Sequence, residues 1–358
     1  MQCFERQDLF VSGQGGYVRY RIPALAAMLK GTILAFCEAR RFTGRDSDQI
    51  DLFLRRSLDG GRTFGEVHVV ATQHDWVCGN PAPVVDRDTG TIWLLFCRNY
   101  RHGDEAMICE GRAPRTVWVT HSDDDGATWS QPREITPQVK PGGWSWYATG
   151  PGHGIQLSSG RLVIPCDHIV FRDGNRQDPH HSHVVYSDDH GRTWQVGGIV
   201  SPGTNECTAF EDAAGRLCLN CRNQHRLTEG GNYRAVAWSQ DGGLTFSPVV
   251  HDAALLEPVC QASVCRWVDG RDGRDLVLFS NPASRTRDHL TVRLSVDGGQ
   301  TWPLGRLLHA GPAAYSDLCV TDKGQILCLY ERGHESPYEA ISLARFGLEW
   351  LSDGSGAS

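Results

Sequence analysis

Ser57-Leu-Asp59-Gly-Gly61-Arg-Thr63-Phe64 is the first of five copies of one eight-residue pattern, Ser-x-Asp-x-Gly-x-Thr-(Trp/Phe). The other copies begin at Ser122, Ser187, Ser239 and Ser295. In each copy the aspartate can accept hydrogen bonds from turn amides, the glycine can adopt a positive φ, and the aromatic residue can pack beneath the turn. Each copy follows a short strand-like run, so the pattern predicts five structural hairpin turns rather than catalytic sites.

A second repeat occurs six times and combines a turn residue, an apolar run and a polar last residue. Continuous apolar runs are typical of strands that are buried on both faces. Six such units of roughly 50 residues, with no helical periodicity between them, predict an all-β fold, a six-bladed β-propeller. The segments are Gly31–Glu38, Gly90–Arg98, Gly160–Asp167, Gly215–Arg222, Arg274–Asn281 and Gly324–Glu331.

Equivalent strands of a propeller run in the same direction, so the polar last residues of the six runs should gather at one end of the central channel. These residues are Glu38, Arg98, Asp167, Arg222, Asn281 and Glu331. We expect residues 1–350 to form the single propeller, with a strand near Phe4 to Val11 closing the last blade. Residues 351–358 are expected to be a disordered tail, and no separate lectin domain is expected.

Composition excludes several classes of function. The 358 residues carry 35 Lys+Arg against 42 Asp+Glu, a formal charge of −7, without basic clusters, which disfavours nucleic acid and anionic membranes as partners. No apolar run is long enough to span a bilayer. The 13 scattered cysteines and a charged N-terminus without a secretory signal favour reduced thiols in the cytoplasm, or secretion if the sequence is trimmed.

Two clusters of possible metal ligands are interpreted as structural. Cys218 and Cys221 are three residues apart on an expected strand, so their side chains should point to opposite faces. His180, His181 and His183 lie in a polar stretch, where a solvated loop is expected rather than a metal site.

Tyr20-Arg21-Ile22-Pro23 precedes the first turn pattern. Together with the five Asp boxes, this motif resembles the signature of the sialidase (neuraminidase) family, whose members are six-bladed propellers. The resemblance extends from Tyr20 to Glu331. It implies an exo-α-sialidase that hydrolyses terminal sialic acids of glycans with retention, without a metal or organic cofactor.

The family binds the carboxylate of the sugar with three arginines, and the resemblance assigns this role to Arg21, Arg222 and Arg287. Arg287 is preferred for the third position because the arginine of the family usually precedes the next strand by a few residues, and Arg285 remains an alternative. Guanidinium groups form bidentate, charge-assisted hydrogen bonds to a carboxylate, which a lysine cannot match. Glu331 resembles the glutamate that orients the first arginine, and Glu38 is expected to add negative charge beside Arg21.

The resemblance assigns the nucleophile to Tyr315 and its base to Glu206. A neutral tyrosine avoids repulsion by the substrate carboxylate, which adjoins the anomeric carbon, but it needs a base to attack at neutral pH. Asp46 resembles the acid/base of the family, with Asp48 as the alternative.

A catalytically inactive sugar-binding propeller is the rival interpretation, together with the same scaffold acting on a related nonulosonic acid or as a trans-sialidase. Linkage preference and oligomeric state depend on loop shapes and surfaces that the sequence does not specify.

Overall fold

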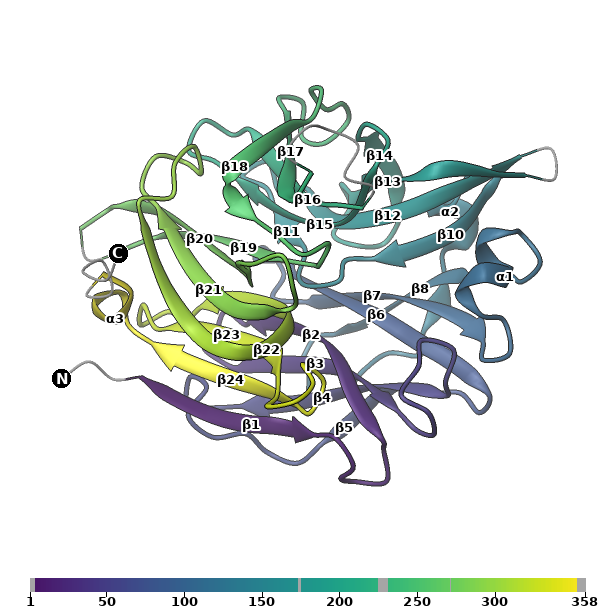
Figure 1. Cartoon of the computed structure of the whole chain (residues 1–358), viewed down its shortest axis with the longest axis horizontal. Coiled ribbons are helices and arrows are strands. Elements are labelled where there is room, and N and C mark those ends of the chain that lie inside the picture. Colours follow the sequence, from purple (N-terminus) through teal and green to yellow (C-terminus); the bar gives the residue numbers. More distant parts are fainter. Residues whose placement is uncertain (1–3, 173–174, 225–230, 271, 353–358) are drawn as a thin grey trace.

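The computed structural model describes residues 4–172, 175–224, 231–270 and 272–352. Antiparallel strands dominate this part of the chain, which contains only three short helices, α1 (Glu105–Cys109), α2 (Thr136–Val139) and α3 (Leu348–Ser352) (Figure 1). The predicted all-β class is therefore confirmed. No helix in the described ranges is long and apolar enough to cross a membrane.

The strands form four hydrogen-bonded sheets. The first contains β2 (Arg19–Ala27), β3 (Ile33–Arg40), β4 (Ile50–Ser57), β5 (His68–Ala71), β6 (Trp76–Val85), β7 (Ile92–Tyr100), β8 (Thr116–Ser122) and β9 (Arg133–Glu134). The second contains β10 (Trp144–Thr149), β11 (Ile155–Gln156), β12 (Leu162–Arg172), β13 (Asn175–Ser187) and β14 (Gln195–Ile199), and the third β15 (Thr204–Glu211), β16 (Leu217–Asn223), β17 (Tyr233–Ser239) and β18 (Val250–Leu256). The fourth contains β19 (Ser263–Val268), β20 (Asp275–Pro282), β21 (Asp288–Ser295), β22 (Leu304–Val320), β23 (Ile326–Arg332), β24 (Ala340–Phe346) and β1 (Glu5–Val11).

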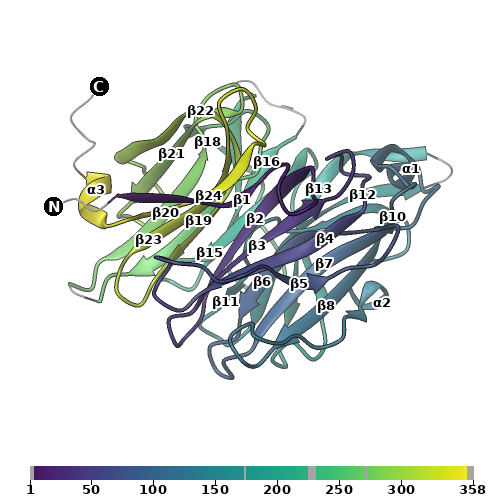
Figure 2. The same ribbon diagram turned by 90° about the horizontal axis from the view of Figure 1, so that it is seen from below.

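The two largest sheets each join two antiparallel units through a weak or bent connection. A single parallel pair, Ile50 with Val77, connects β4 to β6. The long strand β22 pairs with β21 through its first half and with β23 from Ala313 onward. Contacts between sheets follow a cyclic order, because β6 of the first sheet touches β12 of the second, β12 touches β15 of the third, β15 touches β19 of the fourth, and β22 of the fourth touches β2 of the first (Figures 1 and 2).

The five Asp boxes form the turns that the sequence predicts. In the second box, the Asp124 carboxylate accepts hydrogen bonds from the Ser122 hydroxyl (2.8 Å), the Thr128 amide (2.8 Å) and the Thr128 hydroxyl (2.7 Å). Gly126 has a φ of +76°, which glycine adopts without strain. Equivalent bonds occur in the other four boxes, each of which follows β4, β13, β17 or β21.

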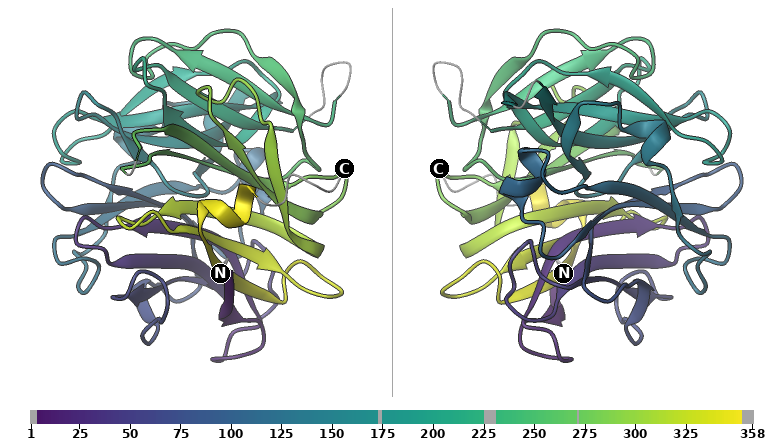
Figure 3. Two further views of the ribbon diagram at one scale, coloured as in Figure 1. Left: turned by 90° about the vertical axis from the view of Figure 1, so that its left-hand side faces the viewer. Right: turned by 90° about the vertical axis from the view of Figure 1, so that its right-hand side faces the viewer.

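There are five boxes but six apolar runs, because the outermost strand of the last unit comes from a distant part of the chain. Each box connects the strand after an apolar run to the next strand outward. In the last unit the outer strand is β1, which pairs antiparallel with β24, so no turn joins them (Figures 2 and 3). The prediction that an N-terminal strand completes the last sheet is confirmed.

The apolar runs form interior strands. β3 and β23, for example, are each flanked by a strand on both sides, and every residue of β3 is buried. Their side chains lie in apolar clusters between neighbouring sheets. In one such cluster, Ile33 of β3 lies together with Leu25 of β2 and Leu343 of β24. None of the twelve cysteines in the described part forms a disulfide, and all but Cys265 are buried.

The histidine stretch differs from the sequence-based prediction of a solvated loop, which is wrong. His180 and His183 lie in β13 and are buried. His168 stacks on Trp144 with ring centroids 3.4 Å apart, and its Nδ1 is 3.0 Å from Nδ1 of His183. Burial lowers the pKa of His183 to about 3, so this ring packs as a neutral group.

The predicted tail begins too early by two residues at least. Leu351 and Ser352 belong to α3, and Leu351 is completely buried against β22 residues such as Leu318. Trp350 stacks on Phe4 with ring centroids 5.0 Å apart, so α3 packs beside the start of β1 (Figure 3). Residues 353–358 lie outside the described residues.

Candidate active site

A polar cavity of about 220 Å³ lies between the strands β2, β6, β10, β15 and β22, each of which contributes lining residues. Its lining includes seven of the eight predicted site residues and the strand-terminal residue Asp167, and the eighth predicted residue, Glu331, lies directly behind Arg21. The lining residues among them are Arg21, Glu38, Asp46, Asp167, Glu206, Arg222, Arg287 and Tyr315.

Three of the six strand-terminal residues do not line this cavity, and of these only Glu331 contacts a predicted lining residue, Arg21. Arg98 stacks on Trp118, with Cζ 4.3 Å from the ring centroid, while its neighbour Asn99 lines the cavity. Successive residues of a strand point to opposite faces, so a count that is one residue off selects the wrong side chain. Asn281 instead donates to the Leu256 carbonyl (2.8 Å). The prediction that all six gather at the channel is therefore wrong for Arg98 and Asn281.

Arg21 is held by a carboxylate that is completely buried. Its Nε donates to Glu331 Oε1 (2.8 Å), and Nη2 lies 3.3 Å from Oε2. The same carboxylate accepts the amides of Ile22 (2.9 Å) and Tyr315 (3.1 Å). Desolvation opposes the charge on Arg21, but Glu331 raises its pKa well above the usual value. Glu331 thus fixes both the first arginine and the backbone of the tyrosine.

Arg287 faces the same space from the loop before β21. Its Nη1 donates to the Tyr338 hydroxyl (2.8 Å) and its Nη2 to the Val259 carbonyl (3.2 Å). Its Cζ lies 5.5 Å from the centroid of the Tyr315 ring, over which Arg21 also lies at 5.0 Å. Arg285 is exposed and does not line the cavity. The arginine that converges with Arg21 and Arg222 is therefore Arg287.

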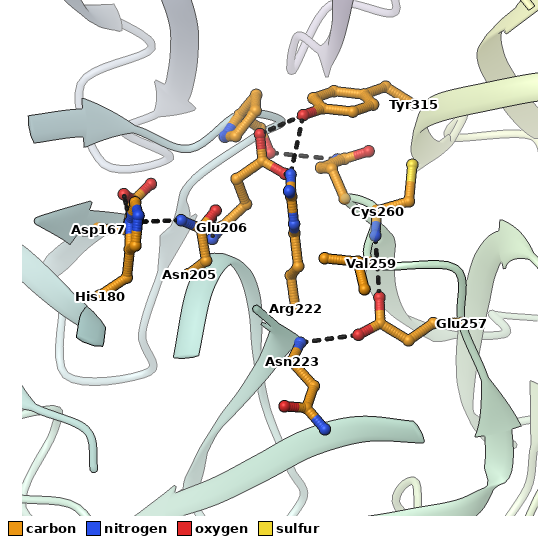
Figure 4. Close-up of polar contacts among 12 residues, drawn as sticks. Asp167, His180, Asn205, Glu206, Arg222, Asn223, Glu257, Val259, Cys260 and Tyr315 are labelled. Atoms are coloured by element: carbon orange, nitrogen blue, oxygen red, sulfur yellow. Dashed lines mark hydrogen bonds and ion pairs between the residues drawn. The ribbon is translucent and has the colours of Figure 1, made fainter. Parts of the chain in front are cut away.

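Tyr315, Glu206 and Arg222 form one hydrogen-bonded group (Figure 4). The Tyr315 hydroxyl donates to Glu206 Oε1. Arg222 Nη1 donates to Glu206 Oε2 (2.7 Å) and lies 3.4 Å from the tyrosine oxygen. The three residues come from β22, β15 and β16, so packing between two sheets brings the hydroxyl to the carboxylate.

The electrostatics of this group keep the phenol neutral at rest. Burial and the negative charge of Glu206 raise the pKa of Tyr315 well above 10, although Arg222 and Arg287 oppose the shift. A reaction at this oxygen would require the loss of its proton, and Glu206 accepts the hydrogen bond that this proton makes. Arg222 lies near both oxygens and can stabilise negative charge on either of them.

Asp46 and Asp48 occupy different environments in the loop between β3 and β4. Asp46 projects into the mouth of the cavity with a side chain 66% exposed, and its Oδ1 lies 2.7 Å from Arg40 Nη1. Desolvation raises its pKa, but Arg40 and Arg21 outweigh this, so the net shift is downward. Asp48 is buried and accepts the amides of Phe42, Thr43, Gly44 and Gln49. Its carboxylate organises the loop that presents Asp46.

Glu38 lies beside Arg40 rather than against Arg21. Its Oε2 accepts from Arg40 Nη2 (2.6 Å) and Nε (3.0 Å), and its Oε1 accepts the Asn80 amide (2.8 Å). Glu38 therefore balances the charge of Arg40, which in turn contacts Asp46.

Several lining residues were not predicted. Arg115 is buried, donates to the Tyr147 carbonyl (2.6 Å) and contacts the side-chain oxygens of Asn80 and Asn99. The sequence gives a weak indication of Arg40, because it lies two residues after Glu38 on one strand and should therefore point to the same face. No feature of the sequence indicates that the remaining polar lining residues belong to the site. They include Trp146, His180, Gln224 and Glu105.

One group of possible metal ligands occurs among the described residues. Asp86, Asp88 and His190 place one ligand atom each within 4.8 Å of one another. The group lies outside the cavity, and Asp86 already accepts hydrogen bonds from Gln156 and Thr89.

Comparison with known proteins supports the resemblance. Residues 31–328 match the model of the BNR repeat-like domain. The chain is 38% identical to a sialidase of Micromonospora viridifaciens, over 97% of this chain and 54% of that protein, and 32% identical to human sialidase-3, over 96% and 92%. It thus spans about half the length of the Micromonospora relative. The solved structure of Hadza microbial sialidase Hz136 superposes with a TM-score of 0.86 at 31% identity, covering 97% of this chain and 69% of that chain.

Proposed function

The chain belongs to the sialidase family, and we propose that it is an exo-α-sialidase that releases terminal α-linked sialic acids from glycans. One observation carries the proposal: a buried tyrosine hydroxyl donates to a glutamate at the centre of three converging arginines. A cation cluster of this kind suits a sugar that carries a carboxylate. The hydroxyl and its base suit attack on the adjacent anomeric carbon.

In the first step, Arg21, Arg222 and Arg287 hold the carboxylate and the Tyr315 oxygen attacks the anomeric carbon, C2. Glu206 accepts the phenolic proton as the new C–O bond forms. The glycosidic C–O bond breaks with oxocarbenium-like charge on the ring, and Asp46 protonates the departing oxygen. The product of this step is a covalent sialyl-tyrosine.

In the second step, a water molecule gives a proton to Asp46 and attacks C2. The bond to Tyr315 breaks, and Glu206 returns the proton to the phenolic oxygen. Two successive inversions at C2 yield net retention.

Asp46 needs a proton for the first step, although Arg40 and Arg21 lower its pKa in the free protein. A bound substrate would change this balance, because its carboxylate pairs with Arg21 and its leaving group shields Asp46 from water. Both effects raise the pKa toward the range of a general acid.

We also propose that the fold has six blades. The first sheet divides into two units at the single β4–β6 pair, and the fourth sheet divides into two units at the bend of β22. The four sheets thus contain six antiparallel units. Six apolar runs, one to each unit, support this count.

The experiment that tests the mechanism uses a 2,3-difluorosialic acid, which forms the covalent intermediate and slows its hydrolysis. Intact mass spectrometry should show one added sugar, and digestion should locate it on the peptide that carries Tyr315. The first product formed from an aryl sialoside should be the α-anomer by NMR. A label on another residue contradicts the tyrosine mechanism, and binding without turnover identifies a sugar-binding propeller instead.

A further inference from the structure

A second cavity, of about 460 Å³, lies further along the strands that line the active site. β2 lines the active site with Arg21 and this cavity with Leu25, and β15 does the same with Glu206 and Phe210. A strand rises about 3.3 Å per residue, so the two sets of side chains are separated by about 13 Å. The two cavities share no lining residue, and the volume of the second suits a small molecule.

The wall of this second cavity is mainly apolar. Its buried side chains include Leu25, Phe210, Val264 and Leu318, which come from four different strands. Leu29 also lines the cavity and is 55% exposed, so it lies where the cavity meets solvent. Moving an apolar group from water onto such a wall is favourable. The wall therefore suits the apolar part of a ligand.

One imidazole faces the cavity from the segment between β10 and β11. Nδ1 of His153 lies 2.7 Å from Oδ1 of Asp317, and no described residue provides a partner for Nε2. The His153 side chain is 14% exposed, whereas that of Asp317 is 1% exposed. Because Nδ1 lies against the buried carboxylate and His153 lines the cavity, the accessible edge of the ring is the one that carries Nε2.

The surroundings of Asp317 favour a positive charge on this ring. The Asp317 carboxylate also accepts the Ser263 hydroxyl (2.7 Å) and the amides of Leu25 (2.7 Å) and Leu318 (3.1 Å). A buried carboxylate with this many donors is stable as an anion beside a cation, and His153 is the ionisable group among these partners. Burial opposes protonation of His153, but the pair with Asp317 outweighs it and raises the pKa of the imidazole. The doubly protonated ring presents Nε2–H to the cavity as a charge-assisted donor.

Most of the other charged lining residues are basic as well. Arg87 donates to two oxygens of Gln156 (2.8 and 3.2 Å) and has no carboxylate within 4.0 Å in the described part of the chain. Arg266 pairs with a carboxylate outside the lining (2.7 Å). Glu211 is the one acidic residue among the described lining residues, and its carboxylate accepts the amide and the hydroxyl of Ser158 (2.8 Å each). An apolar wall with basic groups around it is complementary to an amphipathic anion.

We propose that this second cavity binds a small organic acid, whose apolar body contacts the wall and whose carboxylate accepts a hydrogen bond from Nε2 of His153. A fatty acid and an aromatic acid share this chemistry and differ in the shape of the apolar body. The inference goes beyond the sialidase activity and does not depend on it, because the two cavities have separate lining residues.

The test measures the binding of matched acids and alcohols by isothermal titration calorimetry. The probes are 2-naphthoate with 2-naphthalenemethanol, and octanoate with 1-octanol, so that each pair shares one apolar body. At least one of the two acids should bind the wild-type protein at least about tenfold more tightly than its alcohol, because only the acid forms a charge-assisted hydrogen bond. The acid that binds better identifies the shape of apolar body that the wall accepts. No measurable binding of either acid, or equal affinity for acid and alcohol in both pairs, overturns the inference.

His153→Gln removes the charged donor and keeps an amide that can donate to Asp317. The preference for the acid over its alcohol should fall to about threefold or less, while affinity for the alcohol should change by less than about twofold. His121→Gln is the matched control. His121 also lies beside an aspartate, with Nε2 3.7 Å from Asp123 Oδ2, but it does not line the cavity. This control should keep the wild-type preference.

Leu29→Glu tests the same cavity without a change near the buried Asp317. Because Leu29 is more than half exposed, the replacement should fold, and its carboxylate should repel the acid and leave binding of the alcohol weakened by less. Leu58→Glu is the control, because Leu58 is 77% exposed in the first Asp box and does not line the cavity. Thermal melting shows whether each variant is folded. If His153→Gln does not fold, Leu29→Glu decides, and an unchanged preference in the folded variants overturns the inference.

The three arginines of the active site also attract carboxylates, so the titrations are repeated with saturating 2,3-didehydrosialic acid. This sugar acid carries its own carboxylate and should occupy Arg21, Arg222 and Arg287 without changing the affinity for the organic acid. Displacement of the organic acid by the sugar acid places it in the active site and overturns the inference. A preference that persists with the sugar acid present and is lost in His153→Gln supports the second cavity.

Discussion

The two ends of strand β4 show two ways in which this chain uses aspartate. At one end, Asp59 sits in an Asp box and bonds to residues two to four positions away. At the other end the loop before Ile50 carries Asp46, in a cavity whose hydrogen bonds include pairs as far as 310 positions apart, such as Arg21 with Glu331. The boxes are complete within one turn, whereas the cavity exists only when several sheets pack. Changes at the cavity should therefore affect chemistry, and changes in a box should affect stability.

The largest effect is expected for Tyr315→Phe, which removes the nucleophilic oxygen and leaves the ring. Hydrolysis of sialosides should fall by about 10³-fold or more, with little change in melting temperature. Tyr330→Phe is the control, because Tyr330 is also buried but does not line the cavity. Full activity in Tyr315→Phe would contradict the covalent mechanism.

Glu206→Gln should reduce kcat by about 10²- to 10⁴-fold, since the amide cannot accept the phenolic proton as a base. The loss should appear for all leaving groups, because the tyrosine must be deprotonated whatever group departs. Comparison of kcat for aryl and natural sialosides measures this. A loss confined to natural substrates would move the acid role from Asp46 to Glu206.

Asp46→Ala should show the opposite pattern. Hydrolysis of a natural sialoside should fall by about 10²-fold or more, and that of a nitrophenyl sialoside much less, because an activated phenol departs without a proton. The ratio of the two losses, measured where the first step limits the rate, is the diagnostic quantity.

Asp48→Ala tests the alternative in the same loop. Its carboxylate holds four loop amides, so its loss should lower activity on both substrates alike. A leaving-group effect in Asp48→Ala, with none in Asp46→Ala, would reverse the assignment.

Arg21→Lys should have an intermediate effect of about 10- to 100-fold on kcat/KM. The ammonium keeps the charge, but it cannot pair with Glu331 and the substrate carboxylate through a planar fork. Because Glu331 also accepts the Tyr315 amide, the variant tests whether Glu331 still fixes the backbone of Tyr315 when Arg21 is replaced. Kinetics that match the wild type would show that charge alone suffices at this position.

The smallest effect on activity, less than about twofold, is expected for Asp124→Asn in the second box. The Asp124 carboxylate is held at a pKa of about 2 by the turn hydrogen bonds, below the ordinary value of 3.8. A lowered pKa stabilises the fold above about pH 4, and this contribution is lost as the pH falls toward 2. The melting temperature of the variant should lie slightly below that of the wild type at pH 7 and converge with it near pH 2. A large loss of activity at pH 7 would show that the boxes do more than form turns.

The same contrast separates what the sequence predicted well from what it did not. The boxes and the apolar runs are repeated local patterns, and each needs only its own residues to form a turn or a buried strand. Arg21, Tyr315 and Glu206 could be located through motifs that resemble a known family. Arg98, Asn281 and the histidines of β13 were misjudged, because a shift of one residue, or an unforeseen strand, reverses which side chains are buried.

The sequence by itself determined the all-β class, the five turns and several residues of the cavity, since these follow from periodicity and from short motifs. Only the tertiary structure decided which of two neighbouring residues faces the cavity. Asp46 rather than Asp48 and Arg287 rather than Arg285 reach it, and Glu38 neutralises Arg40 rather than Arg21. The reason is physical: a hydrogen-bond partner that is distant along the chain is set by how sheets pack, and no local pattern encodes that distance.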